Sequence, residues 1–267
     1  MRNAIMVVLS GGQDSTTCLV WAKKYFDEVH AVTFDYNQRH AREIQAAKDV
    51  AKLCKVASHE IITLGSILRG CSPLTDPGQP LEQYPDFATM DQIIGNRVEL
   101  TFVPMRNALF LALAANRAIC LDVQHLVTGV CQADNANYPD CRGSFVAATQ
   151  HMIQEALGLW AGFTVHAPLL ELPKEKSIAL MYNLGGFELL AFTHTAYDGQ
   201  YPPVGNDHAT LLRAHGFEQA CMPDPLVVRA WEEGWMPLPT TANYANQKQI
   251  EDVITRVNAL KVELDQN

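Results

Sequence analysis

The chain alternates between short apolar runs and longer segments whose apolar residues recur every three or four positions. Apolar runs occupy residues 4–9, 29–35, 57–64, 125–130 and 163–167. Segments with the longer spacing begin near residue 16 and cover 41–53, about 106–121 and 173–185. Short apolar runs between turn residues are typical of buried strands, and the longer spacing is typical of helices packed through one face. The alternation predicts an α/β fold with a parallel, doubly wound sheet covered by helices on both faces.

Residues 65–100 interrupt this alternation. They contain four prolines and a glycine between positions 73 and 85, which makes them too irregular for a regular element and too long for a simple connection. We expect an insertion over the functional site, which acts either as a lid or as an inert surface loop.

The C-terminal part of the chain differs in character from the first 195 residues. Residues 222–239 are rich in proline and aromatic residues and predict a strap over the domain. Apolar residues from Ile250 to Leu264 then recur at helical spacing, and Asn246 is placed to cap that helix. An apolar helical face most often packs on its own domain, so we expect this rather than a partner-binding stripe. We predict a main domain at residues 1–195 and a C-terminal region at 196–267 that ends in an amphipathic helix.

The connection between the first apolar run and the first helix reads Ser-Gly-Gly-Gln-Asp-Ser at residues 10–15. Two adjacent glycines allow a sharp turn and a close approach of the backbone to a ligand. The serine hydroxyls and the first helical amides supply donors where the helix dipole is positive. We therefore predict a phosphate-binding loop rather than a simple turn. It is not a Walker A loop, because no Gly-Lys-Ser/Thr follows.

Further polar residues follow the other strands, at the edge of a parallel sheet where ligands collect. Residues 131–142 combine carboxylates, amides, an arginine and a tyrosine, which suit a purine ring. An arginine that begins a helix suits a phosphate or carboxylate, and a lysine in a first helical turn suits an anionic ligand. The candidates from these segments are Gln38, Arg39, Arg106, Asn107, Gln132, Asp134, Tyr138, Asp140, Arg142 and Lys174.

Composition narrows the class of protein. The 267 residues carry a net charge of −9, which argues against a broad basic surface for nucleic acid and favours small anionic substrates or a protein partner. No apolar stretch approaches the roughly 20 residues that span a bilayer, and no signal peptide precedes the first strand, so we expect a cytoplasmic enzyme. The seven cysteines are scattered without a Cys-x-x-Cys pair, which predicts neither a disulfide framework nor a zinc ribbon.

Four stretches carry a resemblance to a known family. They are Ser-Gly-Gly-Gln-Asp-Ser-Thr-Thr-Cys-Leu-Val (10–20), Val-Thr-Phe-Asp-Tyr-Asn-Gln-Arg-His (32–40), Phe-Val-Pro-Met-Arg-Asn (102–107) and Thr-Gly-Val-Cys-Gln-Ala-Asp-Asn-Ala-Asn-Tyr-Pro-Asp-Cys-Arg (128–142). Through these motifs, about residues 1–195 resemble the 7-cyano-7-deazaguanine synthase family, the QueC type of PP-loop ATP pyrophosphatase in the queuosine pathway.

The resemblance implies the ligands and the chemistry of the site. ATP and Mg²⁺ bind at the loop, the carboxylate of 7-carboxy-7-deazaguanine attacks the α-phosphate, and an amine then attacks the activated carbonyl. Family members commonly dimerise, which implies a homodimer. The residues assigned to ATP are Ser10, Gly11, Gly12, Asp14 and Ser15. Those assigned to the deazaguanine are Arg106, Asn107, Asp134, Tyr138, Asp140 and Arg142, with Gln38, Arg39, Gln132 and Lys174 as further candidates.

The chain departs from the family pattern at the C-terminal zinc site. Family members carry four cysteines there, whereas this sequence has Ala196 at the first position and no cysteine within 203–210, so zinc is not expected. Met105 replaces a usual glycine, and Gln132 and Ala133 replace a usual Glu-Thr pair. A rebuilt metal site stays open as an alternative, although no compact pair spacing is present. Its candidate ligands are His194, Asp198, Asp207, His208, His215 and Cys221.

Two acceptors compete for the activated deazaguanine. QueC-like proteins of bacterial anti-phage systems transfer it to a polypeptide N-terminus, and the missing cysteines, the altered pair at 132–133 and the added tail favour this conjugation. The alternative acceptor is ammonia, which gives 7-cyano-7-deazaguanine. A non-catalytic nucleotide-binding module is disfavoured because Asp14, Ser15, Arg106 and Asp134 are retained. tRNA thiolation and amidotransfer are disfavoured because neither a Cys-x-x-Cys pair, a basic RNA surface nor a glutaminase domain is visible.

Overall fold

Five parallel strands form one sheet in a computed structural model that describes residues 3–39, 42–70, 72–95, 97–133, 136–158 and 162–266. The strands are β1 (Ala4–Val8), β2 (Glu28–Asp35), β3 (Ser58–Thr63), β4 (His125–Val127) and β5 (Thr164–His166). Their order is β3-β2-β1-β4-β5, and Met6 of the central strand lies in register with His30 of β2 and Leu126 of β4. The predicted parallel, doubly wound sheet is confirmed, although β4 is shorter than the apolar run at 125–130.

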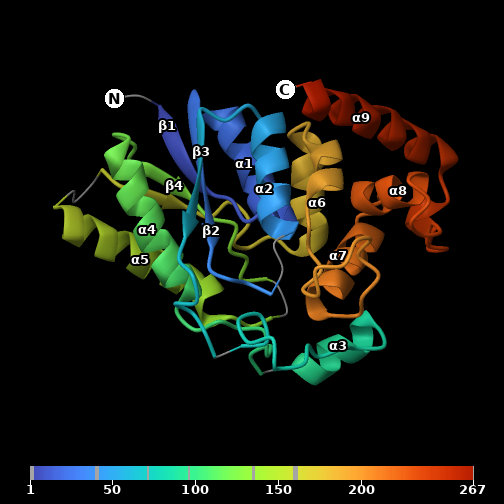
Figure 1. The fold of residues 1–267 in the computed structure, drawn as a ribbon, viewed down its shortest axis with the longest axis horizontal. Coiled ribbons are helices and arrows are strands. Elements are labelled where there is room, and N and C mark those ends of the chain that lie inside the picture. The colour runs from blue at the N-terminus through green and yellow to red at the C-terminus, as the bar shows by residue number, and fades with distance from the viewer. Residues whose placement is uncertain are drawn as a thin grey trace.

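Helices cover both faces of this sheet (Figure 1). They are α1 (Gln13–Tyr25) and α2 (Arg42–Leu53) on one face, and α4 (Arg106–Cys120) and α5 (Gly143–Leu157) on the other. The side chains of successive residues in β1 point to opposite faces of the sheet. Ile5 and Val7 belong to the core cluster that includes α1 and α2, whereas Ala4 and Met6 belong to the cluster that includes α4. All four are at most 2% exposed, so the sheet separates two apolar cores.

A further group of helices packs outside α1 and α2 (Figure 1). Its members are α6 (Lys174–Asn183), η2 (Phe187–Phe192), α7 (His208–Gln219), α8 (Pro225–Glu232), η3 (Ala242–Tyr244) and α9 (Gln247–Gln266). Ile250, Val253 and Val257 of α9 join the core cluster of α1 and α2, which confirms that this helix packs on its own chain. Asn246 Oδ1 accepts a hydrogen bond from Gln249 N at 3.3 Å, as expected for a cap. None of the described helices is long and apolar enough to cross a membrane.

Helix α8 lies within the stretch for which the sequence predicts a strap. The Asp224 side chain accepts a hydrogen bond from Leu226 N at 2.9 Å and so caps a helix whose first residue is Pro225. Asp224 also pairs with Arg213 of α7, whose Nε and Nη2 atoms donate to its two oxygens at 2.6 and 2.8 Å. Both side chains are 3% exposed, so a buried ion pair joins α7 to the start of α8.

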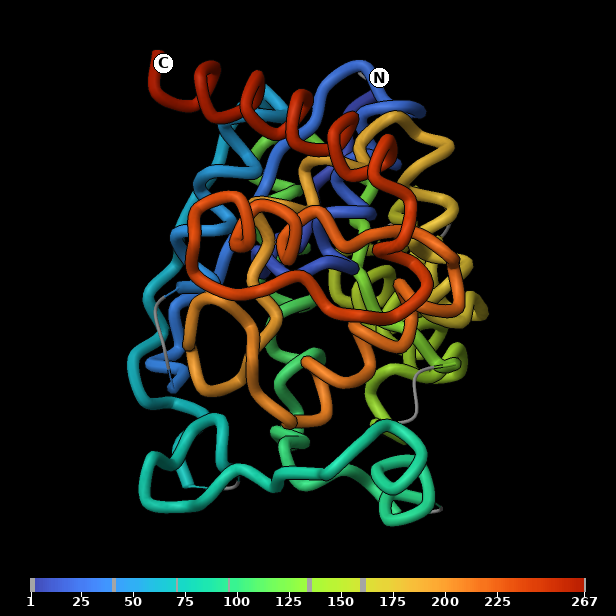
Figure 2. The backbone as a smooth tube through the Cα atoms, turned by 90° about the vertical axis from the view of Figure 1, so that its right-hand side faces the viewer, coloured from blue at the N-terminus to red at the C-terminus, as the bar shows by residue number. Residues whose placement is uncertain are grey.

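Residues 65–100 run along the end of the molecule opposite α9 (Figure 2). The prediction that they hold no regular element is wrong, because α3 (Phe87–Ile94) forms there. Asp86 Oδ1 accepts a hydrogen bond from Thr89 N at 2.7 Å, which starts a helix just beyond the last proline of the segment. The Phe87 ring stacks on His215 of α7 with centroids 3.7 Å apart, so the segment is anchored on α7.

Candidate active site

A cavity of 710 Å³ opens at the carboxyl edge of the sheet. It lies where β1 and β4 are neighbours, the point from which the strand order runs outward in both directions. The loop after β1, the turn after β2 and the loop after β4 all contribute to its wall. Open α/β sheets bind ligands at such switch points, so this cavity is the candidate active site.

Five of the described helices begin at this cavity. The first or second residue of each lines it: Gln13 of α1, Arg106 of α4, Ser144 of α5, Lys174 of α6 and His208 of α7. Helix starts carry partial positive charge and amides without intrahelical partners. The N-cap residues of α1 and α6 offer no side-chain hydrogen bond, which leaves these amides to a ligand or to solvent. The cavity therefore attracts anions, although the chain as a whole is acidic.

The loop at residues 10–15 turns tightly around its own hydroxyl groups. Ser15 Oγ donates to Gly12 O and accepts from Ser10 N, each at 3.1 Å, and the two serine hydroxyls lie 3.0 Å apart. Helix α1 begins at Gln13, earlier than the apolar spacing predicts, so Asp14 and Ser15 lie in its first turn. The cavity wall includes Ser10, Gly12, Asp14 and Ser15, as expected for residues assigned to ATP.

Gly11 faces away from the cavity. It has a φ of +85°, and a Cβ placed there would lie 2.2 Å from the Glu43 carbonyl oxygen and 2.7 Å from the Ala47 amide nitrogen. Its own carbonyl accepts a hydrogen bond from His194 N at 2.9 Å. Gly11 therefore lets α2 pack directly on the loop, while the segment after η2 holds the loop from the other side.

Lys174 and Asp14 form an ion pair in the cavity wall. Lys174 Nζ donates to both carboxylate oxygens of Asp14, at 3.0 and 2.9 Å. The Lys174 side chain is 9% exposed, and Lys174 is the first residue of α6. Burial and the positive end of the helix dipole both disfavour a positive charge there. Asp14 offsets both effects, and the pair brings one charge of each sign to the start of α1.

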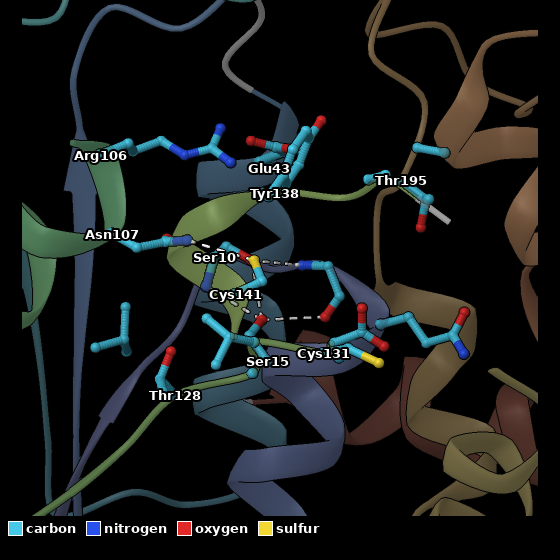
Figure 3. Close-up of a pocket in the computed structure, with 18 of the residues that line it drawn as sticks. Ser10, Ser15, Glu43, Arg106, Asn107, Thr128, Cys131, Tyr138, Cys141 and Thr195 are labelled. Carbon is cyan, nitrogen blue, oxygen red and sulfur yellow. Dashed lines mark hydrogen bonds between the residues drawn. The ribbon is translucent and has the colours of Figure 1, made fainter. Parts of the chain in front are cut away.

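Arg106 lies on another part of the wall, among a carboxyl group and phenol rings. Figure 3 shows Arg106 and Glu43 pointing toward one another, with Tyr138 beside them. Burial opposes the charge of Arg106, but nearby tyrosine oxygens, that of Tyr36 first, raise its pKa, so the guanidinium stays cationic. Burial raises the pKa of Glu43 to about 7, and the Arg106 charge limits that rise. A cation is thus held beside a carboxyl group that titrates near neutral pH.

The loop at residues 131–142 is fastened to the start of α4. Asn107 donates from its amide nitrogen to Asp140 Oδ2 and from Nδ2 to Asp140 O, both at 3.2 Å. Asp140 is 8% exposed and lies outside the cavity wall, so it positions Asn107. The Tyr138 hydroxyl contacts Thr101 Oγ1 at 2.6 Å and donates to Glu99 Oε2 at 3.1 Å, which fixes its ring at the wall.

Most of the remaining substrate candidates also line the cavity; these are Gln38, Arg39, Gln132 and Arg142. Arg39 Nη1 donates to the carbonyl oxygens of Pro73 and Gln79 at 3.3 and 3.0 Å, so it ties the turn after β2 to residues 65–100. Gln132 Oε1 accepts from the first amide of α5 at 2.8 Å. Asp134 lies outside the residues that the structure describes.

The candidate metal ligands have other partners or are dispersed. Among the described residues, no group of three or more histidine, cysteine, aspartate or glutamate side chains is arranged to hold a metal ion. Asp207 caps α7 by accepting from Thr210 N and Oγ1, each at 3.0 Å, and Asp198 accepts from Gln200 N at 2.9 Å. His215 stacks on Phe87, and Cys221 is exposed. Only His194 and His208 of the six line the cavity.

Several further lining residues were not singled out by the sequence patterns. They are Tyr36, Glu43, Phe110, Thr128, Cys131, Cys141, Thr195, Tyr197 and Arg213. The position of Tyr36 and Thr128 at strand ends is a usable signal, since ligands collect at that edge. Thr195 and Tyr197 follow η2 and reach the wall through tertiary packing, for which the sequence carries no local signal.

Comparisons with known proteins show the family of the chain. The family model described as "Queuosine biosynthesis protein QueC" matches residues 4–221. The chain is 46% identical over 230 residues to the 7-cyano-7-deazaguanine synthase of Gloeobacter violaceus, covering 85% of this chain and 96% of that protein. It is 42% identical to the enzyme of that name from Laribacter hongkongensis, with coverages of 84% and 94%. It is 43% identical to the one from Chromobacterium violaceum, with coverages of 85% and 94%. At this level of identity over nearly the whole of each relative, the chain belongs to the QueC family.

Proposed function

We propose that the protein is a 7-cyano-7-deazaguanine synthase that consumes ATP and ammonia. One observation carries the proposal: a single cavity joins the phosphate loop and Lys174 to Arg106 and the loop at 131–142. ATP and a planar anionic substrate therefore fit against different parts of one wall. The relatives carry this name, and they support ammonia as the acceptor better than the protein amine that the departures in sequence favour.

The phosphate loop and Lys174 are the ATP side of the site. The first amides of α1, the hydroxyls of Ser10 and Ser15 and the Lys174 ammonium supply donors to phosphate oxygens. Asp14 fits a magnesium ion, because its carboxylate borders the cavity and Mg²⁺ commonly binds one or two carboxylates together with phosphates. When bound, Mg²⁺ neutralises phosphate charge.

Arg106 and the loop at 131–142 are the deazaguanine side. The half-buried guanidinium of Arg106 pairs with the 7-carboxylate, and its fixed position at a helix start orients that group. Asn107 and the polar residues of the loop supply hydrogen bonds to the edge of the base. Phe110, whose ring stacks on Phe34 with centroids 4.4 Å apart, supplies an apolar surface at the wall.

The reaction consists of two adenylations. A carboxylate oxygen attacks the α-phosphorus, the bond between the α-phosphorus and the bridging oxygen breaks, and pyrophosphate leaves. Ammonia attacks the activated carbonyl, loses a proton, and AMP leaves to give the amide. The amide oxygen then attacks the α-phosphorus of a second ATP and a second pyrophosphate leaves. Loss of AMP and of the two remaining N–H protons gives the nitrile. Positioning and charge stabilisation account for these steps without a nucleophilic residue.

Mass spectrometry of the products tests the proposal. Purified protein is incubated with ATP, Mg²⁺ and 7-carboxy-7-deazaguanine, with ammonium in one reaction and with a peptide that has a free N-terminus in another. We expect the nitrile in the ammonium reaction, with two AMP and two pyrophosphate released for each nitrile. A peptide adduct formed in place of the nitrile would establish conjugation instead, and absence of pyrophosphate release would contradict both.

A further inference from the structure

Two buried side chains in the cavity wall have polar atoms without a hydrogen-bond partner among the described residues. The side chains are those of His208 and Gln13, and the atoms are the two ring nitrogens of His208 and Nε2 of Gln13. His208 is 3% exposed and Gln13 is 5% exposed, so both side chains are buried. Buried polar groups are nearly always paired, and exceptions in a binding site are typical of groups that a ligand completes.

Both side chains line the same cavity as the ion pair of Lys174 and Asp14. Gln13 precedes Asp14 and is the first residue of α1, while His208 is the first residue of α7. Helix α7 packs closely on α6: a Cβ placed on Gly216 would lie 2.4 Å from Lys174 Cγ. The Asp207 cap fixes the start of α7, so the imidazole is held in the wall of the cavity.

The imidazole is neutral at physiological pH. Burial lowers the pKa of His208 to about 4, and the charge of Lys174 adds to that effect. A neutral imidazole offers one N–H donor and one acceptor nitrogen. It therefore supplies a donor beside Lys174 without a second positive charge.

We propose that His208 donates a hydrogen bond to the pyrophosphate part of ATP, with the side-chain amide of Gln13 as a second donor. This inference rests on the proposed function, because it takes ATP as the ligand of the phosphate loop. The cavity wall contains a lysine ammonium, the starts of α1 and α7, and two donor groups without a partner among the described residues. These groups favour an anion rich in acceptor oxygens. Ammonia, the other small ligand of the reaction, is mainly a hydrogen-bond donor, so a site for ammonia needs hydrogen-bond acceptors in the wall.

Binding of inorganic pyrophosphate in the presence of Mg²⁺ tests this assignment without the deazaguanine. Isothermal titration calorimetry compares the unmodified protein with His208→Ala and with His208→Gln, which keeps an N–H donor. The control is His215→Ala, on the same helix but outside the cavity wall. We expect His208→Ala to weaken pyrophosphate binding about tenfold, as for a lost hydrogen bond to a charged group, and His208→Gln to retain part of the affinity. We expect His215→Ala to bind as the unmodified protein does.

Two further readouts separate ligand binding from a structural role. The ring ¹⁵N resonances of His208 shift on addition of pyrophosphate if the imidazole contacts it, and KM for ammonium stays unchanged in His208→Ala. Unchanged pyrophosphate affinity in His208→Ala, or a rise in KM for ammonium alone, would overturn the assignment. If the unmodified protein neither bound pyrophosphate nor released it from ATP, the proposed function would fail as well, and this result differs from a failure confined to the His208 variants.

Discussion

Lys174 and Asp14 neutralise one another in a cavity whose other fixed charges attract anions. The pair lies at the start of α1, where phosphate groups are proposed to bind, and both of its contacts are short. A phosphate that contacts Lys174 competes with Asp14, which is then available to a magnesium ion. Under the proposed function, the same two residues pair with one another before ATP binds and offer opposite charges to the ligands afterwards.

Replacement of Lys174 by methionine removes the cation and keeps the apolar stem. We expect the rate of pyrophosphate release from ATP to fall roughly 100-fold, because one preorganised donor to the phosphates is lost. Lys176 is exposed on the same helix, so Lys176→Met is the matched control and retains the rate of the unmodified protein. Equal rates for the two variants would remove Lys174 from the ATP side of the site.

Glu43 makes the stability of the protein depend on pH. Its pKa in the folded protein is about 7, raised by burial from an ordinary value of 4.5, so folding favours the protonated form. The cost of the buried carboxylate is absent below pH 4.5, grows as the pH rises and reaches about 3 kcal/mol above pH 7. We expect Glu43→Gln and the unmodified protein to have similar free energies of unfolding at pH 5, with Glu43→Gln more stable at pH 8.

Urea unfolding at the two pH values measures this difference. Glu251 is exposed on α9, so Glu251→Gln is the control and is expected to keep the pH dependence of the unmodified protein. The same stability gap between Glu43→Gln and the unmodified protein at pH 5 and pH 8 would contradict the raised pKa.

The residues that sequence predicts for the site are those with local chemical signals. Ser10, Gly12 and Asp14 are marked by a loop motif, and Arg106 by its place at a helix start. Glu43 belongs to the wall because α2 packs on the loop, which the residues of that helix do not show, and the sequence names His208 only as a possible metal ligand. Asp140 carries the right chemistry in the right loop, yet it faces Asn107, because a carboxylate near a helix start also suits a backbone amide.

At the scale of elements, the site is assembled from helix starts. Apolar spacing predicts α1, α2, α4 and α6 because each buries one face, whereas the central place of β1 is seen only in the structure. Helix α3 escapes prediction because a single cap, Asp86, outweighs the prolines that precede it. The approach of α2 to the phosphate loop depends on one atom: the hydrogen that glycine has in place of a Cβ.

Substitution of Gly11 by alanine tests this approach. The new Cβ would meet the backbone of α2 at a positive φ, so we expect a loss of roughly 2–5 kcal/mol in the free energy of unfolding. Gly234 has a φ of +78°, and no atom lies within 4 Å of the point that a Cβ would occupy there, so Gly234→Ala isolates the cost of the backbone conformation. A loss no larger in Gly11→Ala than in Gly234→Ala would show that α2 can move away from the loop.

At the scale of the whole molecule, one apolar cluster joins the beginning and the end of the chain. It contains Val7 of β1, Leu19 of α1 and Val50 of α2 together with Val228 of α8 and Val257 of α9. The sequence predicts a boundary at residue 195 between a main domain and a C-terminal region, and this boundary stays a prediction. Because their apolar side chains share one core, we infer that the two segments are stable only together.

Calorimetry measures this cooperativity. We expect a single thermal transition whose calorimetric and van't Hoff enthalpies agree, because neither segment keeps a complete core without the other. A fragment of residues 1–195 should lack a cooperative transition for the same reason. Two separate transitions in the full chain would establish two independently stable units.

The position of α9 affects how the protein is made. Lys52 of α2 donates to the carbonyl of Leu264, 212 residues later, at 2.8 Å, and Lys55 pairs with Glu263 at 2.7 Å. During translation α2 is therefore synthesised long before α9, the helix that covers it. Until α9 has been synthesised, the part of α2 that it covers stays open to other chains, and the apolar core that α9 completes cannot close.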